Sequence, residues 1–402
     1  MKVSKCIYVF LVAAIAGTAL HAQGNIKLGL IEVKPYINVK ALSDSNIYLQ
    51  QKDEQSSLIM SVNPGLGLVL PNPNARISLD VGMDSISYSH MRATNSATHQ
   101  NVGLSADFKF PVGLDLKLTG AYRDTTDPAT SELTGRTARK QTNMAADIGY
   151  KLSNFISLGV DYNSVTHAYD SDTLKKLNRG ESATGLSVYL AFSPKTSFLI
   201  GYGVGAVAYN EKYADNTANN DDSKTSAVNF GVRGTITPKT KGLVRVGQKT
   251  KTFDNVSKVA DSDGSDITLA LATVTDFSQR TKLTLTGNRD FVESSVHHSA
   301  QSPSRFYTAT NLNADLQQKI TDRVEAKISL GYDMSEYPKE QPFGGKNIKR
   351  ADNIVRTTIA LSRNMGKYLT ASFEYTMRNR DSNIETYQYK NNLVGLTLKA
   401  IF

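Results

Sequence analysis

Alternation of apolar and polar side chains dominates the chain from about residue 31 to its end. In Leu114–Tyr122 and Val324–Tyr332 the even positions are apolar, and in Leu369–Tyr375 the odd positions are apolar. A period of two is that of a β-strand whose two faces meet different environments. Many of these segments exceed the roughly five or six residues usual in soluble sheets and match the roughly 9–11 residues of a tilted membrane strand. The pattern therefore predicts an all-β protein with membrane-spanning strands.

The connections between these segments alternate between short and long. Short turns are predicted at 71–74, 111–113, 153–154, 193–196, 237–240, 278–280, 321–322 and 364–366, and longer polar loops include 126–140, 210–223, 254–266 and 338–353. Short turns on one side and long loops on the other are typical of outer-membrane barrels, with the turns in the periplasm. Eight turns and nine loops would join 18 strands. We therefore expect a transmembrane antiparallel up-and-down β-barrel of 16–18 strands, wide enough for an aqueous channel.

Residues 1–22 have the composition of a secretory signal peptide. Two lysines precede the apolar segment Ile7–Ala16, and Leu20-His21-Ala22 offers a cleavage site, with cleavage after Ala19 as the alternative. The apolar segment is too short to span a bilayer. We therefore expect export and a barrel domain over residues 23–402 in the cell outer membrane of a Gram-negative bacterium, with its first strand beginning near Ile31.

Composition and charge narrow the range of partners. The mean hydropathy of −0.32 excludes a helical membrane protein, which needs runs of about 20 apolar residues, but is compatible with a barrel that has a polar interior. The formal charge of +9 is spread along the chain without a basic run, so nucleic acid is not an expected partner. Outer-membrane lipid and lipopolysaccharide, and a hydrophilic solute or polysaccharide, are the expected partners. Cys6 is the only cysteine and lies in the predicted signal peptide, so no disulfide or thiol chemistry is expected.

The last predicted strand ends on an aromatic residue. Leu396, Leu398, Ala400 and Phe402 share one face of it. A terminal aromatic residue on an alternating strand resembles the recognition signal that the outer-membrane assembly machinery reads, so that machinery is an expected partner. The alternative is the edge strand of a soluble secreted β-protein, but an exposed edge is an aggregation hazard, and pairing with the first strand removes it.

Aromatic residues gather near both ends of the predicted strands, on the apolar parity. Those near the loops are Tyr122, Tyr162, Tyr332 and Tyr375, and those beside the short turns are Phe110, Tyr150, Phe192, Phe198 and Phe277. Two such bands are typical of the aromatic girdles at the membrane interfaces, with ordinary cross-strand packing as the alternative. Tyr88 breaks the parity of its segment, which predicts either a β-bulge or an inward tyrosine.

One stretch near the start of the barrel is more specific. It contains Ser43-Asp44-Ser45-Asn46-Ile47-Tyr48 and then Asn63-Pro64-Gly65-Leu66. This stretch resembles the start of the putative β-barrel porin 2 family, with its "D-S-N-I-Y" segment and "P-G-L" in the next strand. The resemblance implies an outer-membrane barrel, and some relatives are associated with exopolysaccharide secretion. It transfers no catalytic or ligand residue.

Strand parity predicts which charged side chains line the lumen. The candidates are Asp115, Lys117, Arg123, Arg233, Arg245, Lys249, Lys282, Glu325, Lys327, Arg356, Glu374 and Arg378, together with Asp290, Asp315 and Asp333. Both signs are present without a ring of like charge, so we expect weak charge selectivity that slightly favours anions. Pairing of these charges across neighbouring strands, which would only stabilise the wall, is an equally weighted interpretation.

Catalytic and metal chemistry is not expected. The run Asp261–Asp266 has acidic residues at short intervals but lacks the spacing and terminal Glu of an EF-hand loop, and adjacent His297 and His298 would point apart on an extended chain. No nucleophile motif is recognisable, so the sequence predicts neither an enzyme nor a cofactor. The leading hypothesis is a porin-like channel for hydrophilic solutes, with a link to exopolysaccharide secretion suggested by the resemblance. The alternatives are a structural or adhesive barrel whose extracellular loops bind a partner, and a soluble secreted β-protein.

Overall fold

A computed structural model describes residues 26–127, 132, 136–211, 222–254, 263–296 and 303–402. The predicted signal peptide and His297-His298 therefore lie outside the described residues. Among the residues that are described, no helix is long and apolar enough to cross a membrane.

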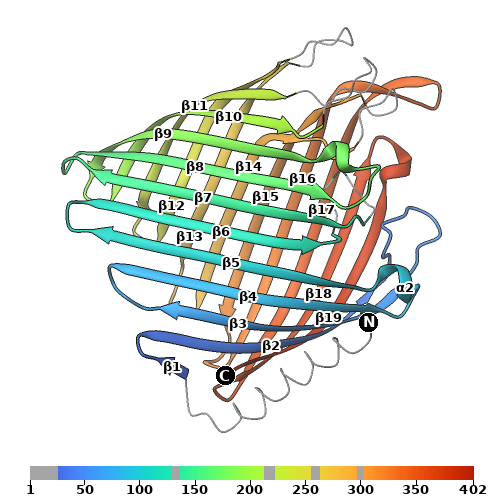
Figure 1. The fold of residues 1–402 in the computed structure, drawn as a ribbon, viewed down its shortest axis with the longest axis horizontal. Coiled ribbons are helices and arrows are strands. Elements are labelled where there is room, and N and C mark those ends of the chain that lie inside the picture. Colours follow the sequence, from blue (N-terminus) through green and yellow to red (C-terminus); the bar gives the residue numbers. More distant parts are fainter. Residues whose placement is uncertain (1–25, 128–131, 133–135, 212–221, 255–262, 297–302) are drawn as a thin grey trace.

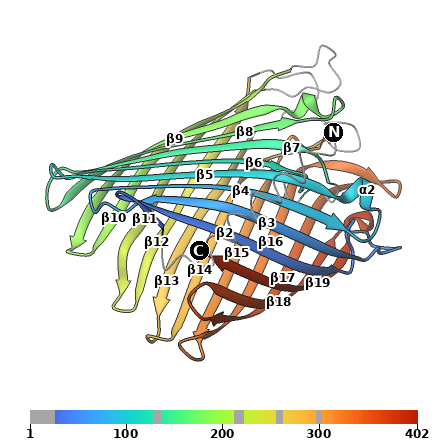
Figure 2. The same ribbon diagram turned by 60° about the horizontal axis from the view of Figure 1, so that its bottom comes forward.

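The protein is a closed antiparallel β-barrel (Figures 1 and 2). A short strand, β1 (Ile26–Leu28), precedes eighteen wall strands, which confirms the predicted fold class and strand number. The wall strands are β2 (Ile31–Asp44), β3 (Ser57–Leu70), β4 (Ala75–Tyr88), β5 (Ala97–Phe110), β6 (Leu114–Thr125), β7 (Arg139–Lys151), β8 (Ile156–Tyr169), β9 (Arg179–Ser193), β10 (Thr196–Tyr209), β11 (Ser223–Thr237), β12 (Thr240–Phe253), β13 (Gly264–Asp276), β14 (Thr281–Glu293), β15 (Phe306–Lys319), β16 (Val324–Phe343), β17 (Lys346–Met365), β18 (Leu369–Ser382) and β19 (Tyr389–Ile401). Three short helical turns lie in the connections, α2 (Arg92–Asn95), η1 (Lys175–Leu177) and η2 (Glu385–Tyr387).

Each wall strand pairs with its sequence neighbours, and β19 pairs with β2 to close the ring. The eight predicted short turns all lie at one end of the barrel, at the left in Figure 1, and the longer connections lie at the other end. Because the number of wall strands is even, β2 begins and β19 ends at the short-turn end. We refer to the opposite end, where the longer connections lie, as the loop end.

The outer face of the barrel is apolar. Leu104, Leu118, Val188, Phe230 and Leu396 are among many large apolar side chains that stay exposed on this face. Such a belt has no place in water but suits the hydrocarbon of a bilayer, where the closed ring satisfies every strand edge. The apolar residues of the alternating pattern therefore face out, and the polar residues face the interior.

Aromatic residues frame this belt near both ends. Phe110, Phe192, Phe198 and Phe277 are exposed beside short turns. Tyr332 and Tyr375 are exposed toward the loop end, and their hydroxyls donate to the side chains of Asn353 and Asn392. These positions suit rings that sit at a membrane interface with one polar tip.

Two local predictions are resolved by the structure. The register between β3 and β4 is constant, so Tyr88 does not follow a bulge but points inward, where it is 4% exposed against Ile47 and Ile59. The predicted loop 338–353 is wrong, because β16 and β17 continue as a hairpin joined by Gly344-Gly345, both in the left-handed region. The buried face of this hairpin carries the charged residues Arg350 and Asp352, so the alternation of apolar and polar residues that reveals strands elsewhere is lost.

Candidate functional site: the barrel interior

Every predicted lumen residue lies on the strand face opposite the exposed apolar belt. On β6, for example, Asp115 and Lys117 alternate with Leu116 and exposed Leu118. The other candidates are distributed over β6 (Arg123), β11 (Arg233), β12 (Arg245, Lys249), β14 (Lys282), β16 (Glu325, Lys327), β17 (Arg356) and β18 (Glu374, Arg378). They therefore form no single cluster but are spread around the interior wall.

Some of these charges pair with a carboxylate of the same wall. Lys249 contacts Asp290 at 2.7 Å, Lys327 contacts Asp315 at 3.1 Å and Arg356 contacts Asp333 at 3.3 Å. Ion pairs that remain partly in water contribute little to stability, roughly 0–1 kcal/mol each. Their main effect is to give the wall side chains of both signs.

Other candidates have a different environment. The guanidinium of Arg233 lies over the ring of Tyr189, 3.8 Å from its centroid. Lys117 sits in register between Asp107 of β5 and Asp147 of β7, in a transverse row of alternating sign. The interior thus offers fixed charges and hydrogen-bonding groups rather than one binding cleft.

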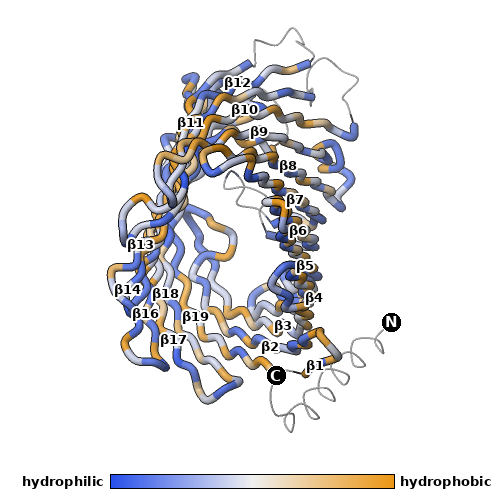
Figure 3. Tube along the Cα trace, turned by 90° about the vertical axis from the view of Figure 1, so that its left-hand side faces the viewer, coloured by the Kyte–Doolittle hydropathy of each residue, from blue (hydrophilic) through white to orange (hydrophobic). Residues whose placement is uncertain are grey.

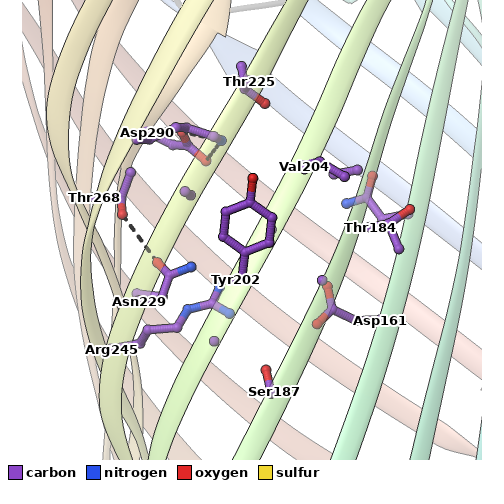
Figure 4. Close-up of a pocket in the computed structure, with 18 of the residues that line it drawn as sticks. Asp161, Thr184, Ser187, Tyr202, Val204, Thr225, Asn229, Arg245, Thr268 and Asp290 are labelled. Atoms are coloured by element: carbon purple, nitrogen blue, oxygen red, sulfur yellow. Dashed lines mark hydrogen bonds and ion pairs between the residues drawn. The ribbon is translucent and has the colours of Figure 1, made fainter.

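The wall formed by β8–β14 carries a shallow hollow of about 220 Å³ (Figure 4). Small residues, including Gly185, Gly201 and Gly203, are part of its lining, and the Asp161 carboxylate lies against Gly185. Polar side chains line it, namely Asp161, Ser187, Thr225, Asn229, Arg245, Lys249, Thr268 and Asp290. This surface can donate and accept hydrogen bonds from a hydrated solute.

Buried charged groups line the interior at the loop end. Lys251 of β12 contacts Glu293 of β14 at 2.7 Å, and both side chains are almost fully buried. The hydroxyl of Tyr209 on β10 donates to the same carboxylate at 3.0 Å. Buried charges are tolerated where they are paired and hydrogen-bonded, so this cluster holds three strands together at the mouth.

A second buried cluster lies on β17 and β18. Arg350 and Arg380 both contact Oδ2 of Asp352, at 2.8 and 2.5 Å, and all three side chains are 1–2% exposed. Arg350 also stacks on Tyr387 of η2, with 3.4 Å from its guanidinium carbon to the ring centroid. Sequence reasoning missed this cluster because Arg350 and Asp352 fell in the predicted loop 338–353.

One side chain reaches this cluster from the opposite wall. Glu132 belongs to the connection between β6 and β7, yet its carboxylate accepts hydrogen bonds from Ser294 Oγ at 3.0 Å and from the Ser295 amide at 2.9 Å. The β6–β7 and β14–β15 connections are eight strands apart in a ring of eighteen. Figure 3 shows β6 and β7 on the wall that faces β13 and β14. The contact therefore crosses the mouth of the barrel.

Burial has an electrostatic consequence for Glu132, which is 3% exposed. Burial raises the pKa of its carboxyl, although the hydrogen bonds from Ser295 and Ser294 and the positive charge of Arg350 act in the opposite direction. At its base the same connection is held by Arg136, whose guanidinium lies over the ring of Tyr88 at 4.6 Å. No sequence signal pointed to Glu132.

The seam between β2 and β19 is where the residues of the family resemblance act. The fully buried Asn46 donates from Nδ2 to the carbonyls of Gln50 and Lys390, and its Oδ1 accepts from the Gln50 amide. In the opposite direction, Nδ2 of Asn391 on β19 donates to Asp44 Oδ1 and to the Asn46 carbonyl, both at 2.9 Å. The D-S-N segment therefore fastens the first and last wall strands together at the loop end.

The other end of the seam is completed by both chain ends. The amide of Phe402 donates to the carbonyl of Pro35 at 2.9 Å, so the last strand pairs with the first as predicted. Beyond this point β1 pairs with Ile31–Val33 of β2 and continues the ladder that β19 leaves. Pro35 lies where β19 ends, so the absence of an N–H on this proline costs the β2–β19 ladder no hydrogen bond. The reading of this strand by the assembly machinery stays a prediction.

The N-P-G-L segment of β3 is also structural. Pro64 has no N–H to donate, and the Asn63 side chain donates instead to the carbonyl of Met83 on β4 at 3.1 Å. Gly65 leaves room for the ring of Tyr36, whose hydroxyl donates to Asp80 at 3.0 Å. These residues shape the wall of the barrel.

Within the described part of the chain, no three His, Asp or Glu side chains gather as metal ligands. Of the predicted acidic run, Asp261 lies outside the described residues, whereas Asp266 contacts Arg289 at 2.9 Å. The Asp266 carboxylate is therefore engaged in an ion pair.

Comparison with known proteins gives the family. A search of curated proteins found no match. Similar solved structures include OccAB3 of Acinetobacter baumannii (TM-score 0.46, 8% identity, 92% of this chain and 99% of that chain covered) and OccAB4 of Acinetobacter baumannii (0.47, 7%, 94% and 99%). The outer membrane protein opdK of Pseudomonas aeruginosa is another (0.45, 9%, 94% and 100%). The family model described as putative beta-barrel porin 2 matches residues 19–402, which confirms the resemblance seen in the sequence. The chain belongs to the putative beta-barrel porin 2 family, and its fold is that of an outer-membrane β-barrel.

Proposed function

We propose that this protein is an outer-membrane channel through which hydrophilic solutes pass. The observation that carries the proposal is the interior wall of an eighteen-strand barrel, which presents charged and hydrogen-bonding side chains of both signs. A barrel of this size has room for water inside, whereas side chains fill one of about eight strands. Family membership supports the same class of protein.

The mechanism is replacement of part of the solute's hydration by the wall. Asn229, Thr268 and Ser187 offer neutral donors and acceptors in the hollow of β8–β14, and Arg245 and Lys249 add positive charge. Because carboxylates such as Asp161 and Asp290 lie among them, ions of neither sign are excluded. We expect weak selectivity with a slight preference for anions.

Planar-bilayer recording tests this proposal. Purified protein that shows a heat-modifiable band, and is therefore folded, should produce discrete conductance steps in potassium chloride, and the same sample unfolded by boiling should not. Folded protein without any steps would refute the open channel.

We extend the proposal to a particular solute, a secreted polysaccharide, because some relatives in the resembled family are associated with exopolysaccharide secretion. Hydroxyl and amide groups in the hollow are suited to the hydroxyls of a sugar chain. Liposome swelling with a series of neutral oligosaccharides measures this directly. Uptake limited to monosaccharides would remove the polysaccharide from the proposal and leave the channel.

A structural or adhesive role has one feature in its favour. The β16–β17 hairpin runs for 20 residues in each strand and projects past its neighbours at the loop end (Figure 1). Shortening only the tip of this hairpin, beyond Tyr337 and Arg350, should abolish surface binding and leave conductance unchanged if adhesion is the function. Unchanged binding after the deletion would exclude this hairpin as the adhesive element.

A further inference from the structure

The carboxylate of Glu132 occupies a site that the opposite wall provides. Three donors or charges of that wall converge on it, namely Ser294 Oγ, the Ser295 amide and the more distant Arg350. Two hydrogen bonds to a buried carboxylate, one from a backbone amide, are the arrangement by which proteins bind acidic ligands. The site is thus already filled by a carboxylate that belongs to the chain itself.

Charge balance shows that the wall needs an anion there. Arg350 and Arg380 contribute two positive charges and Asp352 contributes one negative charge, so this buried cluster carries a net charge of about +1 without Glu132. Glu132 supplies the matching negative charge in its ionised form, although burial raises the pKa of its carboxyl. A buried charge without a partner is costly, so the emptied site would favour an anion from solution.

Two further polar groups at this place have no hydrogen-bond partner. The hydroxyls of Ser295 and Tyr337 belong to side chains that are 3% and 5% exposed, and neither is satisfied among the described residues. Tyr337 is close enough to Glu132 for the two to interact electrostatically. An acidic group larger than one carboxylate could use these hydroxyls as additional donors.

We propose that the groups around the Glu132 carboxylate at the loop end, those of Ser294, Ser295, Tyr337 and Arg350, bind the carboxylate groups of permeating solutes in competition with Glu132. The proposal rests on the proposed channel function and names the class of solute that the mouth recognises. In the free protein the Glu132 carboxylate occupies the position that the carboxylate of a solute would take. An acidic solute that displaces Glu132 breaks its contact with Ser294 and Ser295 across the mouth.

The test uses Glu132→Ala with Glu54→Ala as the matched control, because Glu54 is an exposed carboxylate on another loop. Single-channel conductance of both variants is recorded in potassium chloride, first alone and then with sodium succinate or the neutral succinamide. Glu132→Ala should conduct more than wild type because the cross-mouth contact is lost. Succinate should lower its conductance reversibly, succinamide should not, and Glu54→Ala should behave as wild type.

A binding readout independent of conductance accompanies the recording. Succinate should raise the temperature at which the heat-modifiable band of Glu132→Ala is lost, because a ligand that binds only the folded state stabilises it. Adding Ser294→Ala to this variant should weaken the apparent affinity by about tenfold, the effect of one hydrogen bond to a charged group. Glu132→Gln, which keeps the size of the side chain, checks that the effects follow from charge.

The outcomes separate the two proposals. If folded protein never conducts but succinate stabilises Glu132→Ala, the channel function fails and the carboxylate site stands. If channels form, and Glu132→Ala matches wild type in conductance and shows no stabilisation by succinate, the site is refuted and the channel stands. Equal effects of succinate and succinamide would also overturn carboxylate recognition.

Discussion

Replacing Asn46 by alanine should weaken the seam of the barrel. Asn46 lies just after β2, is 0% exposed and makes three side-chain hydrogen bonds. Two of them, at 2.7 and 3.0 Å, connect it to Gln50, and the third, at 3.0 Å, crosses to the carbonyl of Lys390 on β19. The substitution removes all three and leaves buried backbone groups without their partner.

The magnitude follows from this count. A hydrogen bond contributes about 1 kcal/mol net, and leaving a buried group unsatisfied costs about 1–3 kcal/mol. We therefore expect Asn46→Ala to lower the free energy of unfolding by about 3 kcal/mol. Asn391→Ala loses the two bonds to Asp44 Oδ1 and the Asn46 carbonyl, so about 2 kcal/mol is expected.

The assay is equilibrium urea unfolding of the barrel in phospholipid vesicles. The chain has no tryptophan, so far-ultraviolet circular dichroism reports the transition in place of indole fluorescence. Asn72→Ala is the matched control, because Asn72 lies in an exposed short turn where its side chain accepts one bond, from the Asn74 amide. A loss of stability in Asn46→Ala no larger than in Asn72→Ala would refute the role of this asparagine in closing the seam.

Three further predictions concern the mouth and the chain end. Asp352→Asn should lower the free energy of unfolding by about 3–5 kcal/mol in the same assay, because Arg350 and Arg380 then lose the carboxylate that both contact. A decrease below about 1 kcal/mol, which is the range of surface ion pairs, would contradict this prediction. Burial raises the pKa of Glu132, so docking of its side chain takes up a proton and is favoured at low pH. Wild-type conductance should therefore rise as the pH increases above about 4, the ordinary pKa of a glutamate, and Glu132→Ala should lack this rise. Deleting Phe402 removes its hydrogen bond to the Pro35 carbonyl and an outward aromatic side chain. The fraction of the protein recovered as a heat-modifiable membrane band should therefore fall. An unchanged fraction would exclude Phe402 as part of an assembly signal.

The strands of the wall and the alternation of their two faces could be predicted because alternation is a local property. A side chain such as Lys117 is assigned to the polar face by its neighbours Leu116 and Leu118, without knowledge of any distant strand. The same argument predicted the outward face of the last strand. It failed at the β16–β17 hairpin, where the charged residues Arg350 and Asp352 occupy the buried face and remove the contrast between the two faces.

The candidate sites at the mouth and the seam could not be predicted in this way. Glu132 meets Ser294 across 162 residues of sequence, and Asn46 meets Lys390 across 344. Such contacts depend on how many strands close the ring and on which connections face each other. The D-S-N segment could be recognised as a family feature, but its role in the seam became visible only where β2 and β19 lie side by side.

The sequence by itself determined the strands, their turns and the two faces of the wall, because a period of two and the residues of short turns act over a few neighbouring positions. The tertiary structure alone decided which charges are paired, which are buried and what fills the mouth. Pairing and burial depend on closure of the ring, which brings β2 against β19 and places the β6–β7 connection opposite β14. The interior, for which the sequence predicted charges of both signs, has in the folded protein a polar wall and a mouth held by buried ion pairs.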